Sequence, residues 1–181
     1  MQLLVIRHAR AGSAREFART GANDDLRPLT ADGIERMQLG AAGLHRLVDE
    51  LDMIATSPLV RARQTAEIVT AEFGLPEAIE IEELCPTMPP AAFVEWIQDA
   101  GAKETVAIVG HASPLGELVG LLLSGKPHPI VKIKKGAAVM LELDAEGKSR
   151  RGAGNARLLW SLAPRQLRML GGSAPDAFAH P

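Results

Sequence analysis

Cysteine and aromatic residues are scarce in this chain of 181 residues. It has one cysteine, Cys85, together with no tyrosine, two tryptophans and four phenylalanines. A single cysteine excludes an internal disulfide and is typical of a protein in a reducing cytoplasm. The scarcity of aromatic rings argues against nucleic-acid recognition by base stacking. Zinc binding is not indicated either, because no cysteine or histidine residues have the close spacing of a ligand pair.

The chain also lacks a surplus of positive charge and any long apolar run. Lys and Arg number 20 against 22 Asp and Glu, which gives a formal net charge of −2. General affinity for nucleic acid needs a basic surplus and is therefore not expected. No apolar run reaches the roughly 20 residues of a membrane-spanning helix. Met1 leads directly into an apolar segment typical of a core, and no signal peptide is evident, which again favours the cytoplasm.

The composition is that of one globular domain. Hydrophobic residues make up 46% of the sequence, and a chain of this length can bury a sizeable core. We expect residues 1–170 to form that domain and residues 171–181 to be a flexible C-terminal tail.

Short apolar runs alternate with segments of helical periodicity. This alternation predicts an α/β fold with three layers: a mostly parallel central sheet, helices on both faces and an antiparallel edge. Residues 9–29 are polar and show no sustained period, so we expect an irregular segment there, of the kind that is often functional. The predicted strands cover 2–6, 52–56, 79–83, 105–109, 131–133 and 137–143, with a return strand through 159–161 after a turn at 146–147. The predicted helices cover 31–48, 57–74, 91–99, 112–125 and 164–170, and the second of them begins with Ser57 as N-cap.

Basic and imidazole side chains follow three of the predicted strands. Arg7 and His8 end the first strand, Arg61 lies one helical turn beyond the second, and His111 follows the strand at 105–109. Because the carboxyl ends of parallel strands meet at one edge of a sheet, we expect these side chains to converge. Guanidinium groups and helix N-termini both suit phosphate oxygens. The sequence therefore predicts a phosphate site at this edge.

Two histidines in such a site indicate phosphoryl transfer to an imidazole. One unprotonated imidazole would accept the phosphoryl group, and water would later hydrolyse this covalent intermediate. Arg7 and Arg61 would hold the equatorial phosphate oxygens, on which the charge of the transition state is spread. The second imidazole, in its protonated form, would donate a further hydrogen bond. This scheme needs no metal and no other cofactor.

Three motifs in this order resemble those of the histidine phosphatase superfamily, which is also called phosphoglycerate-mutase-like. They are Arg7-His8-Ala9, in which alanine replaces the family's glycine, the run from Ser57 to Ala66, and Gly110-His111. Three further segments, at 26–30, 83–86 and 160–164, resemble the SixA-type phosphohistidine phosphatases of that superfamily. The resemblance covers residues 2 to about 170.

The resemblance implies roles for particular residues. His8 would be the nucleophile, and Arg7, Arg61 and His111 would form its phosphate pocket. The resemblance also implies that Arg27 is a further phosphate-binding residue. The implied substrate is phosphohistidine in a signalling or phosphotransfer protein.

Two other functions remain open on the sequence alone. The first is a phosphatase of a small phosphoester or phosphoanhydride, which benefits from a carboxylic acid that protonates the leaving group. In the wider superfamily this acid lies between the second and third motifs, where Glu83 is the closer match and Glu82 is its neighbour. Both glutamates also fit the polar end of a strand. The second alternative is a phosphate-dependent binding module without turnover.

Two other features have less specific interpretations. The lysine cluster of Lys126, Lys132, Lys134 and Lys135 would either dock an acidic protein face or protect the edge of the sheet from pairing. Cys85 has no basic neighbour in the sequence, which favours a buried, unreactive thiol.

Overall fold

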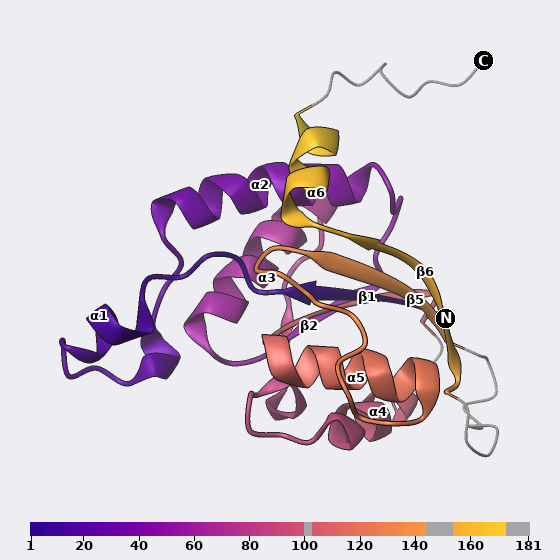
Figure 1. The fold of residues 1–181 in the computed structure, drawn as a ribbon. Helices are drawn as coiled ribbons and strands as arrows, with labels where there is room; N and C mark the ends of the chain where they lie inside the picture. Colours follow the sequence, from indigo (N-terminus) through magenta and orange to yellow (C-terminus); the bar gives the residue numbers. More distant parts are fainter. Residues whose placement is uncertain (100–102, 144–153, 173–181) are drawn as a thin grey trace.

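The computed structural model describes residues 1–99, 103–143 and 154–172, which form a six-stranded sheet in the order β3-β2-β4-β1-β5-β6 (Figure 1). The strands are β1 (Gln2–Arg7), β2 (Met53–Thr56), β3 (Ile79–Glu80), β4 (Thr105–Gly110), β5 (Ala138–Leu143) and β6 (Ala156–Leu162). The helices are α1 (Ala14–Ala18), α2 (Ala31–His45), α3 (Val60–Phe73), α4 (Pro90–Asp99), α5 (Ala112–Ser124) and α6 (Pro164–Gly171). Two short 3₁₀ turns, η1 (Asp24–Leu26) and η2 (Glu82–Leu84), complete the described elements.

Helices cover both faces of the sheet, as the sequence predicts. Helices α2, α3 and α6 pack on one face and α4 and α5 on the other (Figure 1). The side chains of β1 alternate between the two layers: Leu4 and Ile6 belong to the first core, while Leu3 and Val5 belong to the second. All four are fully buried. A continuous aliphatic run, rather than an alternating one, is what a strand buried on both faces requires.

The sheet is mostly parallel, but the reversed strand is not its edge. β1 pairs with β4 in parallel and with β5 in antiparallel orientation, and β6 pairs with β5 in antiparallel orientation. Two reversals give β6 the same direction as β1, so β5 alone runs against the other five strands. The expected antiparallel edge is therefore an antiparallel pair of strands at that side of the sheet.

Strand register brings three carboxyl ends to the same level. Arg7, the last residue of β1, lies opposite Gly110, the last residue of β4. Thr56 at the end of β2 lies opposite Val109 of β4. The segments that leave β1, β2 and β4 therefore start side by side, which is the arrangement that a ligand site in an open α/β sheet needs.

Helix boundaries follow local signals in part. Thr30 caps α2 as predicted, because its hydroxyl accepts a hydrogen bond from the Gly33 amide at 3.0 Å. The predicted start of α3 at Ser57 is wrong. Leu59 is its N-cap, and no side chain caps this helix. Ser57 is fully buried, and its hydroxyl lies against a histidine instead, so it belongs to the site described below.

Three other expectations are corrected. Residues 9–29 are not wholly irregular, since they contain α1 and η1. The strand expected at 79–83 ends at Glu80, because the chain turns into η2, where the Cys85 amide bonds to the Glu82 carbonyl. Residues 131–133 form no strand. The place beside β1 is taken by β5, and the Ile133 carbonyl accepts a hydrogen bond from Arg7.

The predicted turn at 146–147 lies outside the described residues, as does the predicted tail apart from residues 171 and 172. Within residues 1–99, 103–143 and 154–172, no helix has the length and apolar character of a membrane span.

The α2–α6 contact depends on glycine. A Cβ atom at Gly43 of α2 would collide with the backbone carbonyl of Leu167 in α6, which cannot move aside without separating the two helices. We expect Gly43→Ala to lower the free energy of unfolding by about 3 kcal/mol and the melting temperature by roughly 9 °C. Thermal denaturation followed by circular dichroism measures this.

Gly40, one turn earlier in α2, is the matched control for Gly43. A Cβ atom there meets nothing within 4 Å, and alanine is the better helix former by up to about 1 kcal/mol. Gly40→Ala should therefore leave the melting temperature unchanged or raise it. Equal losses of stability in the two variants would show that the close helix contact is not the cause.

Candidate active site

Four residues predicted for the site lie together at the carboxyl edge of the sheet. Arg7 ends β1 and His8 follows it, Arg61 lies in the first turn of α3, and His111 is the N-cap of α5 directly after β4. The rings of His8 and His111 have their centroids 5.2 Å apart. His8, Arg61 and His111 are each at most 6% exposed. The predicted convergence of these side chains is confirmed in position, while their roles stay predictions.

His8 is held in the tautomer that a nucleophile needs. Its Nδ1 lies 2.7 Å from the Ala9 carbonyl oxygen. A carbonyl only accepts hydrogen bonds, so Nδ1 carries the proton and Nε2 carries the free lone pair. Burial lowers the pKa of His8 to about 3, and the neighbouring His111 and Arg61 contribute further in the same direction. The imidazole is therefore neutral near pH 7, with Nε2 available for attack.

Alanine at position 9 is compatible with the backbone there. Among the described residues no position other than glycine has a positive φ, so Ala9 needs no left-handed conformation. Its amide donates to the Thr65 hydroxyl at 3.0 Å, and that hydroxyl donates to the Arg61 carbonyl at 2.7 Å. This relay ties the residue after the nucleophile to the turn of α3 that positions Arg61.

Without a bound anion, burial and two neighbouring guanidiniums disfavour the protonated form of His111, and its role as a protonated donor to phosphate stays a prediction. Burial lowers the pKa of His111 to about 4, and the positive charges of Arg61 and Arg7 lower it further. Its Nε2 lies 3.1 Å from the Ser57 hydroxyl, which leaves Nδ1 as its other hydrogen-bonding atom. An anion bound among these groups would offset the two guanidiniums and restore the affinity of His111 for a proton.

Each of the two arginines of the predicted pocket donates one hydrogen bond to a backbone carbonyl and has further N–H donors without a partner among the described residues. Arg7 Nη1 donates to the Ile133 carbonyl at 3.0 Å, and Arg61 Nη1 donates to the Asp24 carbonyl at 2.9 Å. The Nε atoms of Arg7 and Arg61 are buried and meet no acceptor among the described residues. Buried guanidinium donors without a partner favour an anionic ligand.

Asp24 is a site residue that the sequence reasoning missed. Its two carboxylate oxygens accept from Arg27 Nε at 2.7 Å and Arg27 Nη2 at 3.2 Å. One of them also pairs with Arg61 Nη1 at 3.4 Å. The hydrogen bonds from Arg27 hold the pKa of Asp24 below its ordinary value. The one available signal was the spacing of an acidic and a basic residue three apart in the polar segment.

Arg27 is buried and connected to the pocket through this carboxylate. It is 8% exposed, and its Nη1 donates to the Gly12 carbonyl at 2.7 Å. Arg27 therefore joins the loop after β1 to η1 and lies close enough to Arg61 to lower that residue's pKa. Its predicted phosphate contact is consistent with this position and stays a prediction.

The lysine cluster does not protect a sheet edge. Its four members lie between α5 and β5, outside any strand, whereas the edges of the sheet are β3 and β6. Lys135 belongs to the surroundings of the site: partial burial lowers its pKa, and Arg7 is the first of four arginines that lower it further. No short-range pattern predicts this position, because the loop before β5 brings Lys135 there.

The remaining candidates lie less directly at the site. Glu83 in η2 is partly buried, and its carboxylate makes no hydrogen bond or ion pair with a described residue. Its role as an acid therefore stays a prediction. Cys85 is buried as expected. Its thiol donates to Glu82 Oε2 at 3.1 Å, and burial raises its pKa to about 11, so it is not a nucleophile at neutral pH.

Comparisons with known proteins agree with the motifs. The histidine phosphatase superfamily (branch 1) matches residues 3–85. An uncharacterised protein from Picosynechococcus sp. (strain ATCC 27264 / PCC 7002 / PR-6) is 33% identical over 147 residues, which are 80% of this chain and 87% of that protein. Phosphohistidine phosphatase SixA from Escherichia coli (strain K12) is 29% identical over 173 residues, which are 93% of this chain and 98% of that protein.

A solved structure of the protein histidine phosphatase SixA, complexed with tungstate, is also similar to this chain. The two structures have a TM-score of 0.77 and 28% sequence identity, and the match covers 92% of this chain and 99% of the other. The α/β architecture described above, with its mixed sheet between two helical layers, is thus shared over almost the full length of both proteins.

Proposed function

Because the chain belongs to the histidine phosphatase superfamily, we propose that it removes the phosphoryl group from phosphohistidine in a signalling or phosphotransfer protein. His8 is the nucleophile in this proposal, and Arg7, Arg61 and His111 bind the phosphoryl oxygens. The observation that carries it is the hydrogen bond from His8 Nδ1 to the Ala9 carbonyl, which leaves the Nε2 lone pair free among three phosphate-binding groups.

The reaction has two steps. Nε2 of His8 attacks phosphorus while the bond from phosphorus to the substrate imidazole breaks, and the leaving imidazole takes a proton from solvent. Water then attacks the phosphoryl group on His8, which releases orthophosphate and restores the neutral histidine. Arg7 and Arg61 lower both barriers because their donors hold the oxygens on which negative charge accumulates.

Phosphohistidine hydrolysis needs less acid catalysis than phosphoester hydrolysis, which favours phosphohistidine as the substrate here. An alkoxide is a poor leaving group and needs an acid, whereas an imidazole leaves readily from a labile phosphorus–nitrogen bond. Glu83, the predicted acid, makes no hydrogen bond or ion pair with the described residues of the pocket. The E. coli relative, whose name is phosphohistidine phosphatase SixA, supports the same substrate class.

Substrate preference tests the proposal. We expect kcat/KM for a phosphohistidine-bearing phosphotransfer protein to exceed that for an alkyl phosphate ester such as glycerol phosphate, whose alkoxide leaving group needs an acid, by at least about 100-fold, the size of one missing acid catalyst. Phosphate release by the purified chain measures both rates. Glu83→Gln should reduce the phosphohistidine rate by less than about threefold.

The two alternatives give opposite results in this assay. Faster hydrolysis of the ester, lost in Glu83→Gln, would establish a phosphoester phosphatase with Glu83 as its acid. Tight phosphate binding without release from either substrate would establish a binding module.

A further inference from the structure

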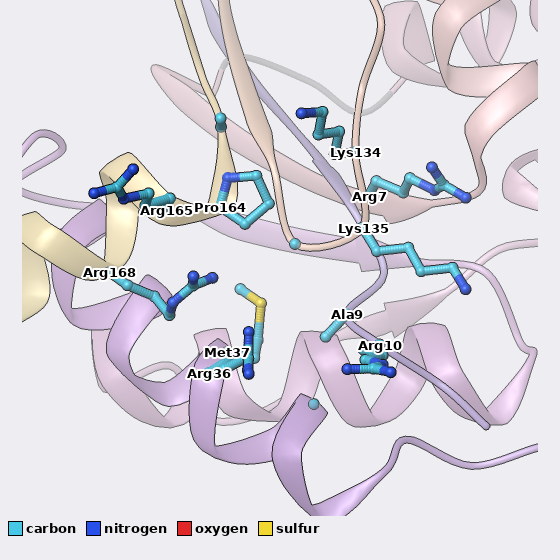
Figure 2. A pocket seen from close by; sticks show the side chains of 13 residues that line it. Arg7, Ala9, Arg10, Arg36, Met37, Lys134, Lys135, Pro164, Arg165 and Arg168 are labelled. Carbon is cyan, nitrogen blue, oxygen red and sulfur yellow. The ribbon is translucent and has the colours of Figure 1, made fainter.

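A basic cavity lies directly beside the nucleophile. It has a volume of about 550 Å³ and is bounded by the end of β1, the first turns of α2, the loop before β5 and the start of α6 (Figure 2). Arg7 and Ala9, the two neighbours of His8 in sequence, form part of its wall, while His8 itself does not. The cavity is thus separate from the phosphate pocket and shares one wall with it.

The lining of this cavity is strongly cationic. Its basic members are Arg7, Arg10, Arg36, Lys134, Lys135, Arg165 and Arg168. The lining includes no acidic residue, although the whole chain has a formal charge of −2. Asp32 lies behind the wall and pairs with Arg10 at 3.2 Å and with Arg36 at 2.5 Å, so it offsets part of the surplus. A concentration of one charge sign in a concave site attracts ligands of the opposite sign.

Two arginines on different helices point into the cavity, and among the described residues only one of them, Arg36, pairs with a carboxylate. Figure 2 shows Arg36 of α2 and Arg168 of α6 extending toward the same space, beside Met37. Arg168 and Arg165 form no ion pair with any residue in the described parts of the chain. The close packing of α2 against α6, at which Gly43 meets Leu167, places the helix positions of Arg36 and Arg168 on the wall of one cavity.

The wall also has apolar parts. Met37, Ala163 and Pro164 contribute carbon surface between the basic groups. A free phosphate would leave this surface in water. Acidic side chains in a peptide place carboxylates on aliphatic stems, and such stems cover the apolar surface while the carboxylates reach the arginines.

We propose that this cavity binds an acidic segment of the phosphohistidine-bearing protein and so selects substrates with Asp or Glu near the phosphorylated histidine. The proposal rests on the function proposed above. Because Arg7 and Ala9 belong to both sites, a segment in the cavity continues directly to a histidine placed at His8. Lys135 of the cavity lining lies near both sites: burial lowers its pKa, and the charges of Arg7 and of Arg27, beside the phosphate pocket, lower it further.

Peptide binding tests the proposal without requiring turnover. The probe is a fluorescein-labelled ten-residue peptide with a central unphosphorylated histidine and six glutamates, and the reference peptide has glutamine in place of glutamate. We expect fluorescence anisotropy to show at least about tenfold tighter binding of the glutamate peptide at low salt. The double variant Arg36→Gln/Arg168→Gln should remove about tenfold of that affinity, since each exposed ion pair contributes a factor of about three.

A matched variant controls for net charge. Lys103→Gln/Arg157→Gln removes the same two charges from exposed positions outside the cavity lining and should change the affinity by less than about twofold. If both double variants lost the same affinity for the glutamate peptide, the binding would depend on net charge alone, and the proposal would be overturned. Tighter binding of pyrophosphate than of the glutamate peptide, lost in Arg36→Gln/Arg168→Gln, would instead assign a small-anion site and also overturn it.

Phosphorylated forms of the two peptides separate this proposal from the proposed function. If the chain hydrolyses both, the ratio of their kcat/KM values should favour the glutamate peptide and fall toward one in Arg36→Gln/Arg168→Gln. An unchanged ratio overturns the docking role while the phosphatase function stands. If neither peptide is hydrolysed, the proposed function fails, and the cavity has then bound an acidic peptide for another purpose.

Discussion

His8→Ala is expected to lower kcat/KM for phosphohistidine hydrolysis by about 10⁴-fold or more, because it removes the atom that accepts the phosphoryl group. Nothing near His8 replaces it. His111, the one other imidazole in the pocket among the described residues, has its Nε2 within hydrogen-bond distance of the Ser57 hydroxyl. Cys85 has a raised pKa and is not a thiolate at neutral pH.

Rapid-quench trapping with a radiolabelled phosphohistidine protein measures the intermediate directly. The unmodified chain should hold a label that is stable in base and labile in acid, as a phosphorus–nitrogen bond is, and His8→Ala should hold none. His45→Ala is the matched control. His45 lies at the end of α2, where it stacks on Phe73 and contacts Glu72, away from the pocket. Label on the His8→Ala chain would contradict the assigned nucleophile.

Arg61→Ala is expected to lower kcat by about 10²- to 10³-fold, the usual loss when one donor to a developing negative charge is removed. Arg61 is 5% exposed, so water does not take over its function easily. Its Nη1 is fixed by the Asp24 carbonyl, and its carbonyl is fixed by Thr65. The guanidinium is therefore held in place before the phosphoryl group arrives, which is the condition for stabilising a transition state more than a ground state.

Arg63→Ala on the same helix is the control for Arg61. Its side chain is 42% exposed and pairs with Glu80, so the variant should keep kcat within about twofold of the unmodified chain. Single-turnover kinetics at saturating phosphohistidine protein measure both variants, and thermal denaturation shows whether each remains folded. A rise in KM with unchanged kcat in Arg61→Ala would show that Arg61 binds substrate and transition state equally, contrary to the proposed role.

The carboxyl edge of the sheet was predictable because its signals are local. Each of the three strands is a short aliphatic run, and the polar residues follow directly in sequence, so parallel pairing alone brings Arg7, His8 and His111 together. Arg61 followed from helical periodicity, since it lies one turn beyond the strand end. The expected roles of these residues came from the resemblance of three motifs to a known family. Hydrophobic periodicity predicts where residues lie but not what they do.

The parts that could not be predicted depend on loops. The resemblance implied Arg27, but Asp24 reaches Arg61 only because η1 contacts α3, and Lys135 reaches Arg7 only through the turn at Gly136. Gly136 has a φ of +73°, and its amide bonds to the carbonyls of Arg7 and His8. Neither contact has a short-range pattern. The burial that lowers the pKa of His111 in the absence of a bound anion is likewise not visible in the sequence.

The two ion pairs of Asp24, with Arg27 and with Arg61, also affect how an anionic product leaves the pocket. Its carboxylate competes with orthophosphate for the guanidiniums of Arg27 and Arg61, and it belongs to the chain, so its effective concentration at those groups is that of a tethered ligand. In the reaction proposed above, hydrolysis of phospho-His8 leaves a free anion, and the carboxylate can pair with both arginines again as the product departs. The proposed phosphate-binding arginines would thereby release the product more readily than they would without Asp24.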